Sequence, residues 1–193
     1  MGSTTKSPAH PSLAHAGRTY LRHPHWSDRH EFLELVAKSR RFHRPWVSPP
    51  ATPEAFRAHL ASLESGTRVS FLVCRRDDHG IVGTVNMNDV VRGVFQNTYL
   101  GYYALGPTAG TGYMREGLGL VLSVGFRTLG LHRMEANIIP ENVRSARLVQ
   151  SLGFRLEGRS PRYLKIAGRW RDHDRWAITV EDWRQKRRGG PGR

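Results

Sequence analysis

The stretch Pro107-Thr108-Ala109-Gly110-Thr111-Gly112-Tyr113-Met114 joins two segments of different periodicity. The preceding residues, 98–105, are rich in β-forming side chains, whereas the following residues place apolar side chains at 118, 121, 122 and 126. The first pattern predicts a strand, and the second predicts one face of a helix. A glycine-rich turn therefore leads from a strand into the N-terminus of a helix.

Backbone N–H groups at such a helix start lack helical partners and lie at the positive end of the helix dipole. Gly110 and Gly112 allow a ligand to approach the main chain closely and permit positive φ. These properties suit a phosphate or pyrophosphate, although a tight strand-to-helix connection could need the same glycines. The stretch is no Walker A loop, because no Gly-Lys-Ser/Thr follows. The third glycine, Gly117, is two positions out of place for a dinucleotide fingerprint.

Length and composition predict one folded domain. The chain has 193 residues, of which 1–16 lack periodicity and are expected to form a disordered leader, 17–182 the domain, and 183–193 a basic disordered tail. No apolar run approaches the ~20 residues of a membrane span. The single cysteine excludes a disulfide framework and a cysteine-based zinc site, and the histidines lack regular metal-ligand spacing. We expect a cytoplasmic protein without a metal.

The formal net charge is +14, and arginine supplies 26 of the 30 basic residues. The excess is spread along the chain, with one dense run at 184–188. This run has two explanations. It is either a solvated tail, or it attracts an anionic cofactor or a ribonucleoprotein that presents the substrate.

Hydrophobic periodicity and turn residues predict the order β-α-α-β-β-β-α-β-α-β-β. The expected strands cover 18–23, 69–75, 81–88, 98–105 and 132–139, followed by a hairpin with arms at 159–166 and 171–179. The expected helices cover 28–39, 53–65, 115–127 and 143–152. This is an α+β fold with a mixed, mostly antiparallel central sheet, flanking helices and one βαβ crossover at the glycine loop.

Four patches in this order resemble the Gcn5-related N-acetyltransferases. They are the glycine loop with its Tyr-Met-Arg-Glu continuation, the run Pro140-Glu-Asn-Val-Arg-Ser-Ala-Arg-Leu148, the turn Ser151-Leu-Gly-Phe154, and the segment 163–173. The last patch and the pair Pro45-Trp46 are most similar to the ribosomal-protein-alanine N-acetyltransferase branch. The resemblance runs from about 17 to 182.

The resemblance implies acetyl-CoA as co-substrate and direct transfer of its acetyl group to a primary amine in a ternary complex. For this branch the acceptor is a protein N-terminal α-amine, which implies association with the ribosome; the protein itself would be a monomer or a homodimer. The implied CoA-binding residues are Tyr103 and Leu105 along the pantetheine, Gly110, Thr111, Gly112, Tyr113 and Met114 around the pyrophosphate, and Asn142 and Arg147 on the following helix.

The resemblance also suggests two catalytic residues. Glu135 matches a position that some relatives use as general base, and Ser145 is the expected general acid, because Val149 stands where many relatives have a tyrosine. Structural roles are open for both, since Glu135 could point outward from its strand and Ser145 could complete the first turn of its helix. Pro107 replaces a side-chain donor of the family loop and lacks a backbone N–H.

Three aromatic residues, Phe42, Trp46 and Tyr102, are expected to bind the acceptor, although Phe42 and Trp46 could instead fill the core. Two other functions are open at this point. One is acetylation of a small amine. The positive charge of the protein argues mildly against cationic small amines, because like charges repel. The other is a ribosome- or RNA-binding module that uses the basic tail and whose CoA binding is vestigial.

Overall fold

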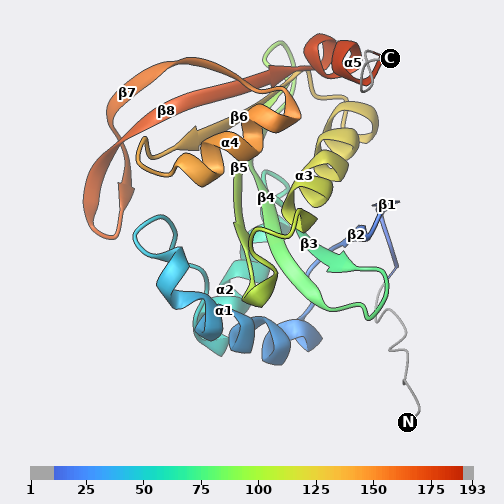
Figure 1. Cartoon of the computed structure of the whole chain (residues 1–193), viewed down its shortest axis with the longest axis vertical. Coiled ribbons are helices and arrows are strands. Elements are labelled where there is room, and N and C mark those ends of the chain that lie inside the picture. The colour runs from blue at the N-terminus through green and yellow to red at the C-terminus, as the bar shows by residue number, and fades with distance from the viewer. Residues whose placement is uncertain (1–10, 189–193) are drawn as a thin grey trace.

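The computed structural model describes residues 11–188, whose strands form one eight-stranded sheet in the order β1-β2-β3-β4-β5-β6-β8-β7 (Figure 1). The strands are β1 (Ala14–Ala16), β2 (Thr19–Arg22), β3 (Val69–Arg75), β4 (Ile81–Val91), β5 (Asn97–Ala104), β6 (Arg133–Ile138), β7 (Arg155–Ile166) and β8 (Arg169–Thr179). All neighbouring strands are antiparallel except β5 and β6, which are parallel. The predicted α+β class and its single crossover are confirmed.

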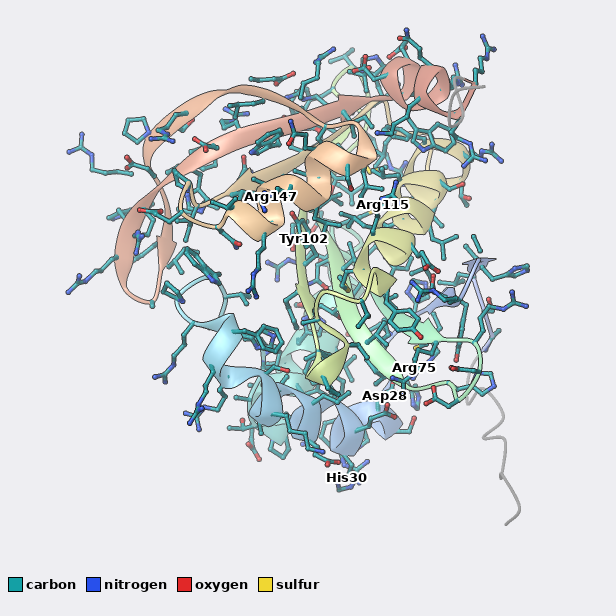
Figure 2. All side chains as sticks on the ribbon, in the orientation of Figure 1. Asp28, His30, Arg75, Tyr102, Arg115 and Arg147 are labelled. Atoms are coloured by element: carbon teal, nitrogen blue, oxygen red, sulfur yellow. The ribbon has the colours of Figure 1, made fainter. Side chains whose placement is uncertain are left out.

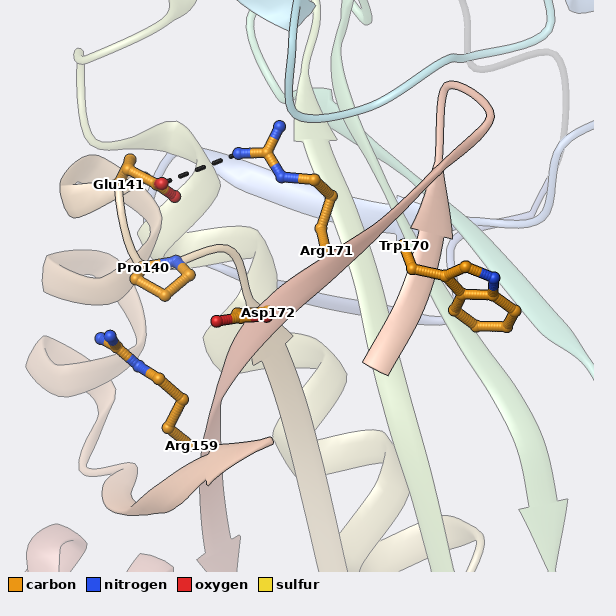
Figure 3. A pocket seen from close by; sticks show the side chains of 6 residues that line it. All are labelled: Pro140, Glu141, Arg159, Trp170, Arg171 and Asp172. Atoms are coloured by element: carbon orange, nitrogen blue, oxygen red, sulfur yellow. Dashed lines mark ion pairs between the residues drawn. The ribbon is translucent and has the colours of Figure 1, made fainter. Parts of the chain in front are cut away.

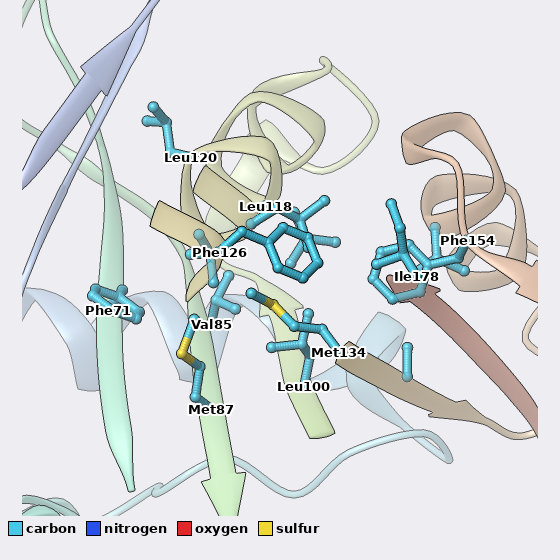
Figure 4. Packing of buried hydrophobic residues seen from close by; sticks show 14 of the residues in the cluster. Phe71, Val85, Met87, Leu100, Leu118, Leu120, Phe126, Met134, Phe154 and Ile178 are labelled. Atoms are coloured by element: carbon cyan, nitrogen blue, oxygen red, sulfur yellow. The ribbon is translucent and has the colours of Figure 1, made fainter. Parts of the chain in front are cut away.

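Helices cover both faces of the sheet (Figure 1). They are α1 (Arg29–His43), α2 (Pro53–Ser62), α3 (Tyr113–Ser123), α4 (Val143–Leu152) and α5 (Val180–Arg188). A larger core lies between the sheet and α3, α4 and α5 (Figure 4). A second core, under α1 and α2, contains Phe32, Phe56 and Leu72. Alternate side chains of each strand enter these two cores, so the two faces of the sheet have different neighbours.

The helix starts follow the capping rules. Thr52 accepts the Ala55 N–H before α2, and Asn142 accepts the Ser145 N–H before α4, at 3.2 and 3.3 Å. Gly153 ends α4 with a φ of +99°. Local sequence therefore sets the position of α4, whose first turn carries Ser145.

Both expected disordered ends differ from the structure within the described residues. Part of the leader, Ala14–Ala16, forms β1 on the edge of the sheet, where Leu13 N–H donates to Leu21 O at 2.8 Å. The tail begins with helix instead of coil, since α5 continues to Arg188 around the buried ring of Trp183, which packs on Phe126. Tertiary packing, which periodicity does not report, orders both segments. Residues 1–10 and 189–193 lie outside the described part of the chain.

The helix expected over 115–127 begins at Tyr113, is α-helical to Ser123 and continues as a π-helical turn, Val124–Thr128. Gly125 in this turn lies against β6, where an added Cβ would meet Met134 Cε at 1.7 Å. Within the described residues three 3-10 turns, Trp26–Asp28, Leu63–Ser65 and Gly106–Thr108, flank the regular helices. The close approach at Gly125 holds the crossover helix tightly on the sheet.

The parallel strands β5 and β6 pair over only three residues. Asn97 lies opposite Arg133, Thr98 opposite Met134, and Tyr99 opposite Glu135. Beyond this point β5 stays paired with β4 as far as Ala104, and β6 stays paired with β8 as far as Ile138. The sheet therefore splits between β5 and β6, and each strand has an unpaired main-chain edge facing the split.

Candidate active site

The split is the centre of the candidate site. Because β5 and β6 are parallel, the helices that follow them, α3 and α4, both begin at the carboxyl ends of these strands. A crevice at this position is the usual ligand site of open α/β sheets. Figure 2 shows Tyr102 of β5 between Arg147 on α4 and Arg115 on α3. Both arginines are exposed.

The glycine loop has the geometry that its sequence predicted. Gly110 and Gly112 have φ values of +86° and +91°, which L side chains adopt only with strain. Gly112 O accepts hydrogen bonds from the N–H groups of Arg115 and Glu116. The N–H groups of Tyr113 and Met114, which precede them, have no acceptor within the helix. The Thr111 N–H, in contrast, already donates to Thr108 O at 3.3 Å. Among the five loop residues expected to hold a pyrophosphate, Thr111 is therefore the one engaged within the loop.

Contacts from other strands fix the loop on both sides. Arg18 donates its backbone N–H to Glu116 at 2.8 Å, its guanidinium pairs with the same carboxylate at 2.5 Å, and it lies over the Tyr113 ring. The Met114 side chain fills the space above Gly83, where an added Cβ would lie 2.1 Å from Met114 Sδ. The first turn of α3 is thus anchored to the β1–β2 turn and to β4, so its N–H groups are held in place before any ligand arrives.

The entry to the loop borders a cavity of about 430 Å³. Its lining residues are Lys38, Phe42, Gly106, Pro107 and Ala109. Phe42 thus lies beside the glycine loop and faces an open space. Trp46 is half-buried in the α1–α2 connection, where its backbone N–H donates to His43 O at 2.7 Å.

Tyr103 and Leu105 are buried in the core under α1 and α2. Their side chains therefore pack the sheet, and only their main chain is available to a ligand in the split. Burial raises the pKa of the Tyr103 hydroxyl, which keeps this group protonated.

Ser145 lies in the first turn of α4, and its hydroxyl meets that of Tyr102 across the split. The Tyr102 Oη to Ser145 Oγ distance is 2.6 Å, and Tyr102 Oη also lies 3.4 Å from Ser145 O. The pKa of Tyr102 is raised by burial, while the hydrogen bond to Ser145 opposes this shift. Tyr102 is therefore on the same side of the sheet as Ser145, and its role in binding the acceptor stays a prediction.

Glu135 lies at the closed end of the split, on the opposite face of β6 from Met134 and Ala136. Its carboxylate accepts hydrogen bonds from Arg133 at 2.8 Å, Arg175 at 3.0 Å and Asn97 at 3.1 Å. Burial raises the pKa of Glu135, but the two arginines together outweigh burial and hold the pKa below its usual value. The carboxylate is thus a weak base whose lone pairs are largely used.

A second, polar cavity of about 250 Å³ lies between the β6–α4 connection and the β7–β8 hairpin (Figure 3). Its lining residues are Pro140, Glu141, Arg159, Trp170, Arg171 and Asp172. Arg171 reaches across it to Glu141, at 3.7 Å, and the Trp170 side chain is 61 % exposed. Because Glu141 directly precedes Asn142, this cavity adjoins the start of α4.

The residues that the sequence left unassigned are those that act across elements. Arg18 and Lys38 have no role in the motifs of the sequence, and the structure places both beside the glycine loop. Arg171 belongs to the segment 163–173 that resembles the family, and it lines the second cavity together with Trp170.

Comparison with known proteins now decides the family. The model of the acetyltransferase (GNAT) domain matches residues 18–155. The chain belongs to the GNAT acetyltransferase family. The [ribosomal protein uS5]-alanine N-acetyltransferase of Escherichia coli (strain K12) is 34% identical over 174 residues, which cover 86% of this chain and 90% of that protein. The chain is accordingly an acyltransferase, an N-acetyltransferase close to those that modify ribosomal proteins.

Solved structures agree with this GNAT assignment. The ribosomal-protein-S5-alanine acetyltransferase of Vibrio fischeri superposes with a TM-score of 0.77 at 29% identity, covering 88% of this chain and 97% of that one. RimJ of Mycobacterium smegmatis, solved in complex with CoA-disulfide, superposes with a TM-score of 0.78 at 27% identity, covering 85% of this chain and 83% of that one. Relatives of this GNAT chain thus bind CoA.

Three further properties of residues 11–188 concern membrane-spanning helices, metal sites and the reactivity of Cys74. No helix within residues 11–188 is both long and apolar enough to cross a bilayer. In the same part of the chain no group of three or more His, Cys, Asp or Glu side chains is arranged to hold a metal ion. The buried Cys74 has its pKa raised to about 11, chiefly by burial, which makes it an unreactive core thiol.

Proposed function

We propose that this GNAT enzyme transfers the acetyl group of acetyl-CoA to a protein N-terminal α-amine. The observation that carries the proposal is that one split in the sheet joins three features: an unpaired strand edge, unused N–H groups at the start of α3, and the Ser145 hydroxyl at the start of α4. The E. coli relative acts on the alanine of a ribosomal protein, which supports an acceptor of the same kind.

The residues present suit CoA. The N–H groups of Gly112, Tyr113 and Met114 would bind the pyrophosphate, with the helix dipole favouring its negative charge. Pantetheine amides would pair with the free edge of β5 near residues 103–105, as an added strand does. Asn142 and the exposed Arg147 would hold the chain and its phosphates from α4. Pro107 contributes no N–H, but the loop amides do not depend on it.

Acetyl transfer forms a C–N bond and breaks the C–S bond, with the electron pair leaving on sulfur. Ser145 would donate its O–H toward this sulfur as negative charge develops there. Because Val149 is fully buried and apolar, the position of the tyrosine found in many relatives offers no donor. The nearby hydroxyl of Ser145 is therefore assigned the role at the leaving group.

The attacking amine must lose a proton, and an α-amine needs only a weak general base for this step. An α-amino group has a pKa of ~7.7–8, against ~10.4 for lysine, so a large fraction is already neutral near pH 7.5. Glu135 is proposed as the base, acting through water from the face opposite Ser145. Its lowered pKa limits its strength, which an N-terminal amine tolerates better than a lysine does.

The acceptor is proposed to approach from the side of α1, α2 and the β7–β8 hairpin. Phe42 offers an apolar wall there, and Asn137 presents a buried side-chain oxygen without a hydrogen-bond partner among the described residues. Such an oxygen suits an N–H-rich chain end. The strong positive charge of the protein favours neutral or acidic N-terminal segments over polyamines.

The test is an acetyl-CoA-dependent thiol-release assay with a panel of acceptors. The panel contains peptides with free α-amines beginning with alanine or serine, the same peptides with a blocked N-terminus and one internal lysine, and polyamines. We expect kcat/KM for alanine-initial peptides to exceed that of the blocked lysine peptides at least tenfold at pH 7.5, from the difference in free-base fraction alone.

Mass spectrometry then locates the acetyl group on the product. Acetylation of the α-nitrogen supports the proposal, and faster turnover of lysine peptides or small amines would replace it with one of the other acceptor classes.

A further inference from the structure

The hydroxyl groups of Tyr102 and Ser145 form a contact to which the proposed function gives no role. Their oxygens lie 2.6 Å apart, which is at the short end for a hydrogen bond between hydroxyls. Tyr102 belongs to the part of β5 that has lost its partner β6, so its ring stands at the split itself. The contact therefore joins the strand on one side of the split to the helix on the other.

On α4, the position where many relatives have a tyrosine hydroxyl is occupied by Val149, and the Tyr102 hydroxyl lies beside this helix instead. Ser145 and Val149 are four residues apart and share one face of the helix. Val149 is fully buried, so this face offers one hydroxyl and then an apolar side chain. The tyrosine oxygen next to this face comes instead from Tyr102 on the strand.

The direction of the hydrogen bond follows from the chemistry of the two groups. A phenol is a stronger acid than an aliphatic alcohol and is the better donor, while the serine oxygen is the better acceptor. Burial raises the pKa of Tyr102, so the phenol keeps its proton throughout the working pH range. When Tyr102 donates to Ser145 Oγ, the hydrogen of Ser145 is free to point elsewhere.

We propose that Tyr102 is a positioning residue that donates to Ser145 Oγ and thereby directs the Ser145 O–H toward the sulfur of the bound thioester. This inference rests on the proposed function. Two hydroxyls in series polarise each other, so the second donor is stronger than an isolated serine. In the low dielectric of the split, such a donor stabilises negative charge on sulfur effectively.

No proton has to leave Tyr102 in this step. The amine nitrogen bonds to the carbonyl carbon, the C–S bond breaks, and its electron pair stays on sulfur as a thiolate that accepts the Ser145 hydrogen bond. A thiol is a far stronger acid than a buried phenol, so the thiolate does not take the phenolic proton. The proton lost by the amine passes to the base, and the thiolate is protonated from solvent on release.

The first experiment is a double-mutant cycle in the acetyl-transfer assay, with Tyr102→Phe, Ser145→Ala and the double variant. Tyr102→Phe should lower kcat about tenfold and change the KM for acetyl-CoA less than about twofold, since the lost hydrogen bond acts on the charged leaving group. The double variant should be no slower than Ser145→Ala, because Tyr102 acts through Ser145. Tyr20→Phe on β2, which removes a tyrosine hydroxyl in contact with His79, is the matched control and should keep wild-type kinetics.

A second measurement does not depend on the acceptor. Thiolate absorbance of CoA bound to each variant gives the pKa of its thiol. We expect this pKa to lie below that of free CoA with wild-type protein and to rise by about one unit with Tyr102→Phe and with Ser145→Ala. Thermal unfolding of each variant verifies that the fold is kept.

The outcomes separate this inference from the proposed function. An unchanged CoA thiol pKa in Tyr102→Phe overturns the inference, and so does an effect of Tyr102→Phe on kcat that is equally large in the Ser145→Ala background. Shifts of the thiol pKa as expected support it even where no protein N-terminus is acetylated, a result that would overturn only the proposed acceptor.

Discussion

Tyr99 of β5 lies opposite Glu135 of β6, and this pair is the last rung of the parallel ladder in the centre of the sheet. Glu135 is held there by Arg133, Arg175 and Asn97, so the closed end of the split is fixed by an ion-pair network as well as by main-chain bonds. From this rung outward the two strands have different partners, β4 and β8, and cannot close on each other. The width of the ligand site is thus a property of the sheet register.

Removing the charge of Glu135 tests that network. Glu135→Gln should lower the free energy of unfolding by about 1–3 kcal/mol at pH 7, less than for a fully buried pair, because Arg175 is partly exposed. The pKa of Glu135 is lowered by folding, so its contribution is present above the unfolded pKa of ~4.3 and is lost as pH falls through the lower folded pKa. Urea unfolding of both proteins from pH 7 to pH 3 should therefore show converging stabilities.

The same variant tests the proposed base. If Glu135 acts as base, Glu135→Gln should reduce kcat and remove the inflection at low pH that protonation of Glu135 causes in the pH–rate profile, since the pKa of Glu135 lies below its usual value. A profile identical to that of the wild type would place the base elsewhere. Glu64→Gln, at an exposed position, serves as the control for both measurements.

Gly112→Val should weaken acetyl-CoA binding. The residue has a φ of +91° at the start of α3, and a Cβ there would lie 3.2 Å from the Arg18 guanidinium. A β-branched residue costs about 1–2 kcal/mol at such a φ and covers the N–H groups that are proposed to hold pyrophosphate. We expect the Kd for CoA, measured by calorimetry, to rise at least tenfold.

Gly66→Val provides the matched comparison, because Gly66 also has a positive φ, +73°, and lies in the α2–β3 connection with open space around its Cβ position. It should lose similar stability and keep its Kd for CoA. Equal affinities of Gly112→Val and wild type would refute the pyrophosphate role of the loop.

Gly83→Ala should displace the first turn of α3. The new Cβ would lie 2.1 Å from Met114 Sδ and 2.8 Å from Tyr103 O. Overpacking of this kind costs about 1–3 kcal/mol. We expect a lower melting temperature and weaker CoA binding, with the additional change Met114→Ala restoring part of both, since it removes only the side-chain clash. No recovery in the double variant would mean that the clash with Tyr103 O dominates.

Asp28→Asn should be among the more destabilising single changes. Asp28 and Arg22 form two hydrogen bonds of 2.8 Å in a buried position, and Asp28 also accepts the His25 N–H. Breaking a buried pair leaves an uncompensated charge and costs about 3–5 kcal/mol. Glu34→Gln, which breaks the exposed Glu34–Lys38 pair, should change stability by less than about 0.5 kcal/mol. Similar losses for both variants in urea unfolding would contradict the dependence on burial.

The parts of the fold that the sequence predicted are those with strong local signals. Thr52 and Asn142 mark helix starts, Gly153 a helix end, and the glycine loop a strand-to-helix turn. Each depends on a few consecutive residues, whose φ preferences and hydrogen-bonding groups are fixed by their type. Glu116, in contrast, pairs with Arg18, a partner 98 positions away that no local rule could supply.

The short strand β1 and the terminal helix α5 could not be predicted from local sequence signals. Ala14–Ala16 has no periodicity to detect, and it is ordered by pairing with β2. In α5, one buried side chain, Trp183, stands among exposed charges, and its ring contacts Phe126, Arg127 and Arg187. Both segments owe their structure to surfaces made elsewhere in the chain.

The sequence by itself determined the family, the order of the elements from β2 to β8, and the turn and cap positions of Gly110, Gly112 and Asn142, because these depend on local backbone geometry and on motifs read along the chain. Only the tertiary structure decided that Tyr102 meets Ser145 and that Glu135 is held by two arginines. These relations are set by strand register and by the angle at which β5 and β6 separate, and both arise from packing between segments far apart in the sequence.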